Sequence, residues 1–207
     1  RFFLGGEWKT QGNTGRGKVF DIKLPPSPGS ASAFREEPFH DTPFLHRFTA
    51  FAEDNIKIPI STTQLEVQAG TRFNAISAKG INTSNFLTIE PRFNVKYDIV
   101  KKKSGLRNLS ARAGWGITYK MPSILYLFPD DAYTDLVSFS YNDFDANNYG
   151  LAILTTKKIV TENDELKPQK SVNFEAGIDI DGGVVSGSVV YFKEKMTDGY
   201  GFVTEYI

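Results

Sequence analysis

The residues best suited to ligand chemistry lie in the segment 121–170, where carboxylates alternate with aromatic rings. Aromatic faces stack on sugar rings and planar ligands, and carboxylates accept hydrogen bonds from hydroxyl groups. We therefore predict a ligand-binding loop. The residues expected to touch the ligand are Tyr133, Tyr141, Asp143, Asp145 and Tyr149. The alternative is a folded external loop whose aromatic side chains form a small core of their own.

Nothing in the sequence predicts catalysis or a metal centre. The chain has no Cys and only two His, too few for a zinc site of the usual kind. The spacing of Asp143, Asp145 and Asn147 resembles the start of a calcium loop, but Asn148 stands where Gly is required and Leu154 where a bidentate Glu is required. Common catalytic and phosphate-binding motifs are missing as well. We expect no enzyme activity, no metal and no cofactor.

Charge and hydropathy exclude further classes. Lys plus Arg and Asp plus Glu each total 24, so there is no electrostatic reason to expect nucleic acid as a partner. No apolar run approaches the ~20 residues of a membrane helix. The N-terminus has no signal-peptide pattern. The chain begins inside a strand-like pattern and stops at Ile207, and we expect it to be part of a larger protein.

Apolar and polar residues alternate strictly along 87–99, and a period of two predicts a strand because a helix would mix the two sets. The same habit predicts five further strands, less cleanly at 48–53, and 184–195 is strand-like although its two faces cannot be told apart, which makes seven strands and no helix. The strand-like segments are 2–8, 48–53, 65–75, 87–99, 109–120, 172–181 and 184–195.

The connections between these strands alternate in length. Those at 59–63, 101–105 and 181–183 are tight, and Asp-Gly-Gly in the last is a hairpin signal. The long ones include 11–43 and 121–170, which we expect to be external loops of one domain spanning 1–207. In a meander every second connection falls on the same rim, so one rim should carry short turns and the other long loops.

The predicted strands run to about a dozen residues, longer than the ~5–6 typical of soluble sheets and close to the ~9–11 of a transmembrane strand. Short turns, long loops, one apolar face and one polar face are typical of outer-membrane β-barrels. We therefore predict an all-β, antiparallel up-and-down meander that forms part of a transmembrane barrel. The apolar side chains expected to face lipid are Ile89, Phe93, Val95, Trp115, Ile117, Phe174 and Ile178. Those expected to face the lumen are Arg72, Glu90, Arg92, Lys96, Arg112, Glu175 and Asp179.

Several segments resemble the barrel of TonB-dependent outer-membrane receptors. Residues 165–171, followed by 173–177, resemble the family's "LKPE-S-x-x-x-E-x-G" stretch, with Gln169 in place of the usual acid. Four more segments resemble family strand motifs and occur in the family's order: 51–54, 69–73, 89–93 and 110–123.

The resemblance implies a Gram-negative outer-membrane receptor, with composition and loops of a Bacteroidetes type. It implies uptake of a scarce nutrient (siderophore, haem, cobalamin or glycan) with TonB-supplied energy. It also implies a 22-stranded barrel around a plug, of which this chain would supply about seven strands and neither plug nor TonB box. The expected partners are outer-membrane lipid, the nutrient, and the TonB system acting through a plug region outside these residues. A passive porin-like channel and a soluble β-rich carbohydrate-binding module remain alternatives.

Overall fold

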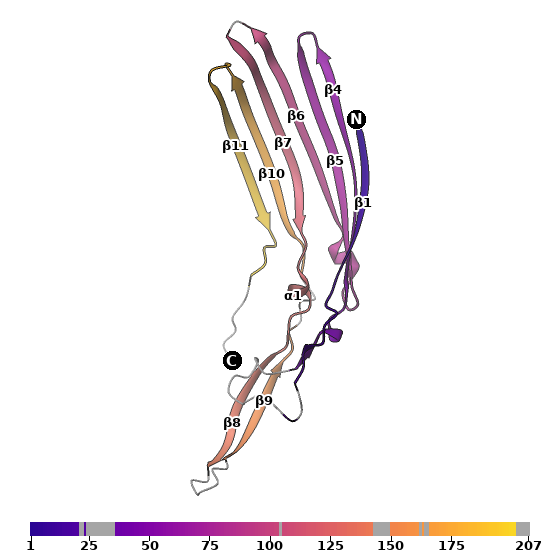
Figure 1. Cartoon of the computed structure of the whole chain (residues 1–207), viewed down its shortest axis with the longest axis vertical. Coiled ribbons are helices and arrows are strands. Elements are labelled where there is room, and N and C mark those ends of the chain that lie inside the picture. The colour runs from indigo at the N-terminus through magenta and orange to yellow at the C-terminus, as the bar shows by residue number, and fades with distance from the viewer. Residues whose placement is uncertain are drawn as a thin grey trace. The chain divides into compact units, whose positions relative to one another are not determined.

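The computed structural model describes residues 1–20, 23, 36–103, 105–142, 150–161, 163 and 166–201 (Figure 1). The chain divides into two compact units. Unit 1 comprises Arg1–Thr10, Leu45–Pro122 and Lys167–Ile207, and unit 2 comprises Gln11–Phe44 and Ser123–Leu166. Each unit is described below by itself.

Unit 1 is built on a seven-stranded antiparallel sheet in the order β1-β4-β5-β6-β7-β10-β11. Each strand pairs with its neighbours in this order, and β1 and β11 form the two edges (Figure 1). This order confirms the predicted antiparallel meander. The strands are β1 (Phe2–Gln11), β4 (Leu45–Ile60), β5 (Thr63–Ser77), β6 (Thr88–Lys103), β7 (Leu106–Lys120), β10 (Gln169–Asp181) and β11 (Ser186–Thr197).

The strand alternation separates unit 1 into two chemically distinct faces. Register places Phe93 beside Trp115 and Trp115 beside Phe174. These side chains and Ile89 are between 42% and 53% exposed. We call this side the apolar face. The other side, which we call the polar face, carries the alternate residues, among them Glu90 at 4% exposure. The predicted segregation of apolar from polar side chains is thus present.

Short turns join β4 to β5, β6 to β7 and β10 to β11, and the antiparallel pairing puts all three at one end of the sheet (Figure 1). Gly105 and Gly183 lie in two of these turns with φ of +81° and +82°, a conformation that costs Gly little and other residues more. The long connections leave from the opposite rim, as predicted. One of them contains the short 3-10 helix η2 (Thr83–Phe86).

The long-loop end of the polar face holds the most deeply buried apolar side chains of unit 1. Leu45, Ile76 and Phe86 are at most 3% exposed. The rings of Trp8 and Phe48, by contrast, stack at 6.2 Å and are both exposed.

Unit 2 contains secondary structure that alternation did not predict, because its strands are short or lack a clear two-residue period. β2 (Gly17–Lys18) pairs with β3 (Glu37–Pro38), and β8 (Ala132–Asn142) pairs with β9 (Gly150–Ile159). A 3-10 helix η1 (Phe39–Asp41) and a one-turn helix α1 (Ile124–Leu127) complete it. Among the described residues, no helix has the length and hydropathy to cross a membrane.

Candidate functional site

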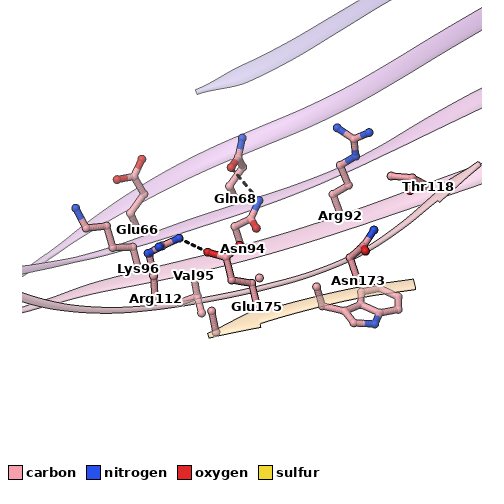
Figure 2. Close-up of a pocket in the computed structure, with 14 residues that line it drawn as sticks. Glu66, Gln68, Arg92, Asn94, Val95, Lys96, Arg112, Thr118, Asn173 and Glu175 are labelled. Carbon is pink, nitrogen blue, oxygen red and sulfur yellow. Dashed lines mark hydrogen bonds and ion pairs between the residues drawn. The ribbon is translucent and has the colours of Figure 1, made fainter. Parts of the chain in front are cut away.

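The polar face of the sheet forms a recess of about 450 Å³ over β5, β6, β7 and β10 (Figure 2). Strand alternation brings its lining side chains to one side, because every second residue of each strand points the same way. Figure 2 shows Glu66, Gln68, Arg92 and Lys96 standing on this side of the ribbon. Gly114 keeps the floor open, since a Cβ there would lie 2.6 Å from Asn94 Oδ1.

All seven side chains predicted to face a lumen lie on the polar face, as the register shows. Lys96 stands opposite Arg112, Arg72 opposite Glu90, and Glu175 opposite Gly114. The structure shows that they share one face. That this face lines a lumen stays a prediction, because the sheet is not closed among the described residues.

Glu90 is the most buried of these charges and the centre of a hydrogen-bonded cluster. Its Oε1 accepts from Asn74 Nδ2 at 3.1 Å and from the backbone N–H of Tyr119 at 3.1 Å. The guanidinium of Arg92 lies 3.5 Å from Oε2. A buried carboxylate is tolerated only when hydrogen bonds and a counter-charge replace its water. Glu90 therefore ties β5, β6 and β7 together.

Arg112 forms the second cluster, towards the short-turn end. It bonds Glu175 and, through Nε, lies 3.2 Å from Asp179 Oδ2. Ser188 on β11 donates to Asp179 at 2.7 Å. One guanidinium thus joins two carboxylates of β10, and the hydroxyl extends the contact to the edge strand. Lys96 stands beside this cluster and contacts Asp98 at 3.6 Å.

Unit 2 has a recess of its own, of about 670 Å³, lined by residues of both long loops. Tyr133, one of the predicted ligand residues, lies in its wall beside Asp131 and Lys158. Lys158 Nζ is 2.6 Å from Asp131 Oδ2 and 5.9 Å from the centroid of the Tyr133 ring. The hydrogen bond from Lys158 lowers the pKa of Asp131, and the same bond raises the pKa of Lys158.

The two described tyrosines of the predicted ligand set do not share a face of the β8–β9 hairpin. Tyr133 pairs with Lys158, but the register shifts between Val137 and Phe139, and Tyr141 pairs with Leu151. An extra residue in one strand of a pair reverses the alternation beyond it. Tyr133 and Tyr141 therefore lie on opposite faces.

The other predicted ligand residues, Asp143, Asp145 and Tyr149, lie outside the described residues, as does most of the calcium-like run. Their ligand-binding role stays a prediction. Within the described part of the chain, no group of three or more acidic, His or Cys side chains is arranged to hold a metal ion.

Sequence reasoning did not single out Lys158 or the loop 11–43 as part of the same recess. Lys18, Glu36 and Asp41 come from that loop and line the recess with Tyr133 and Lys158. Their sequence signal is weak, because each is an isolated charge in a loop. Only the fold of unit 2 brings residues more than a hundred positions apart in the sequence together in the wall of this recess.

Comparison with known proteins agrees with the architecture. The family model for the TonB-dependent receptor-like β-barrel matches residues 1–205. A probable TonB-dependent siderophore receptor, PirA of Acinetobacter baumannii, is 31% identical over 150 residues, which are 72% of this chain. The matched region spans 17% of that relative's length. With a family match over nearly the whole chain and a meander of the expected kind, this chain belongs to the TonB-dependent receptor-like β-barrel family.

Proposed function

We propose that the chain forms part of the barrel of a Gram-negative outer-membrane receptor that takes up a scarce nutrient with TonB-supplied energy. The observation that carries this proposal is the two-faced sheet of a family-matched barrel. Its apolar face suits lipid, and its polar face presents paired charges around an open recess. In this arrangement the polar face lines the lumen and TonB acts through a plug region.

The relative's name makes a ferric siderophore the first substrate to test, with haem, cobalamin and glycans as the alternatives. That relative comes from Acinetobacter baumannii. The Bacteroidetes type of this receptor stays a prediction, which the genome that encodes it would test. A siderophore arriving from outside would first meet the external loops. The recess of unit 2, with Tyr133, Asp131 and Lys158 in its wall, offers a ring face and charges of both signs to it.

The proposal is tested by uptake of radiolabelled iron bound to a siderophore, in cells with and without the full-length gene. Energised import should disappear when TonB is deleted or the proton gradient is collapsed, while binding to the cell surface should persist. Import that survives both treatments would favour the passive porin-like channel. Recovery of the full-length protein outside the outer membrane would contradict the proposal and favour a soluble binding module.

A further inference from the structure

The connection between β7 and β10, residues 121–168, carries the β8–β9 hairpin and leaves the sheet from the long-loop rim. Lys120 on β7 and Gln169 on β10 are the last directly opposed residues before it, and we call them the root pair. Pro122 and Pro168 flank the root pair, and both are buried. Because proline has no N–H to donate, the hydrogen-bonded ladder cannot continue through these two residues.

One side chain from another part of the chain contacts both members of the root pair. The hydroxyl of Tyr200 donates to the carbonyl oxygen of Lys120 at 2.9 Å, and it accepts from the backbone N–H of Gln169 at 3.3 Å. In a hydrogen-bonded pair of an antiparallel sheet, such groups bond each other directly. Here a single hydroxyl bonds both, so it forms the last link between β7 and β10 before the connection begins.

The backbone after β11 brings Tyr200 to this position. β11 ends at Thr197, which stands opposite Lys170, and the next residue, Asp198, has φ of +57°. Residues other than Gly adopt this left-handed conformation mainly where the chain turns. The chain therefore changes direction directly after β11, and the side chain of Tyr200 reaches past β10 to β7. Its contacts join neighbouring strands at the long-loop rim.

Gln169 is also held through its side chain. Its Nε2 donates to Sδ of Met196 on β11, 3.2 Å away. In the family stretch that residues 165–171 resemble, an acid usually stands at this position. An ionised acid has no proton to donate to a thioether, whereas the amide of Gln has two. The departure from the family stretch therefore adds a contact between β10 and β11 beside the Tyr200 hydroxyl.

We propose that Tyr200 is a positioning residue, whose hydroxyl clasps the root pair and thereby fixes where the connection 121–168 leaves the sheet. This connection includes Tyr133 and Lys158, which line the recess of unit 2. A binding site that is held in place before its ligand arrives loses less conformational freedom on binding. The proposal rests on the proposed function only in taking this rim as the side on which the nutrient arrives.

The test uses the full-length receptor in detergent and measures hydrogen–deuterium exchange by mass spectrometry over residues 118–128 and 166–172. Tyr200→Phe removes only the hydroxyl and should make these segments exchange about tenfold faster, because two hydrogen bonds at the root pair are lost. The matched control is Tyr191→Phe, since Tyr191 is 61% exposed on β11. Among the described residues no hydrogen bond involves its hydroxyl, so this variant should exchange as wild type does.

A cross-link distinguishes a clasp at the root pair from a side chain that stabilises the barrel in general. Directly opposed residues have Cα atoms about 4.5–5.5 Å apart, a separation that a disulfide can span, and the 207 residues contain no Cys. Adding Lys120→Cys/Gln169→Cys to Tyr200→Phe should therefore restore slow exchange when the disulfide is oxidised. Reduction of the disulfide should make exchange fast again.

Unchanged exchange in Tyr200→Phe would overturn the clasp, and so would an equal acceleration in Tyr191→Phe. Fast exchange that persists in the oxidised, cross-linked variant would mean that Tyr200 acts elsewhere than at the root pair, and this too would contradict the proposal. Siderophore-iron import, measured separately in cells, reports on the proposed function. Because exchange is measured without a nutrient, failure of either proposal can be told from failure of the other.

Discussion

Val95 lies in the middle of β6 on the apolar face, where it pairs with Val67 and Ala113. If that face meets lipid, Val95→Arg puts a charge near the bilayer midplane, where Arg costs about 2–4 kcal/mol. Ile117 is four residues along β7 from Ala113. At about 3.3 Å per residue and a tilt near 45°, it lies roughly 9 Å closer to the long-loop rim. The apolar band of such barrels is about 25 Å tall, so Ile117→Arg should cost only about 0–1 kcal/mol.

The assay is reversible unfolding of the full-length receptor in lipid vesicles by denaturant, with the free energy of unfolding compared among variants. Asn94→Arg is the matched control, since Asn94 adjoins Val95 at nearly the same depth and lies on the polar face. It should cost less than about 1 kcal/mol, the contribution of its exposed hydrogen bond to Gln68. A cost for Val95→Arg equal to that of Asn94→Arg would refute a lipid-facing apolar face. A larger cost at Ile117 than at Val95 would refute the assigned depth.

Three further outcomes are expected. Glu90→Ala should lower the free energy of unfolding by about 1–3 kcal/mol, because it leaves the amide of Asn74 and the backbone N–H of Tyr119 without their acceptor. Glu90→Gln, which keeps an acceptor, should cost clearly less, and equal costs in vesicle unfolding would contradict the cluster. The pKa of Asp131 should lie below its usual value of 3.8. Its ion pair with Lys158 is therefore present above pH 3.8 and is lost only as the pH falls through the lowered pKa. In the Lys158→Met variant, NMR of the Asp131 carboxyl group should show this pKa move back up. Tyr133→Ala should weaken siderophore binding by up to about tenfold. Tyr141→Ala should change the affinity little, since Tyr141 lies on the opposite face of the β8–β9 hairpin from Tyr133. Equal losses of affinity in the two variants, measured by titration, would contradict siderophore binding in the recess of unit 2.

The fold of unit 1 could be predicted because residue alternation within each strand and the residue types in the turns indicate where its strands lie. A period of two, read along 87–99, assigns each side chain to a face without knowledge of any neighbour. Turn residues such as those at 181–183 fix where strands end. The pairings β4–β5, β6–β7 and β10–β11 then follow from short connections, since strands joined by a tight turn pair with each other, whereas β1–β4, β5–β6 and β7–β10 are joined by long connections. The family match over residues 1–205 agrees with this reading.

What the sequence could not supply depends on register and on contacts between distant segments. The shift between Val137 and Phe139 reverses the side-chain alternation and parts Tyr133 from Tyr141, although both stand at odd positions of one strand. The burial of Glu90 requires Asn74 and Tyr119 to arrive from neighbouring strands. Sequence determined which face each residue of a regular strand occupies, because alternation is a property of one strand. Only tertiary structure decided which residues stand side by side, because register is a property of two.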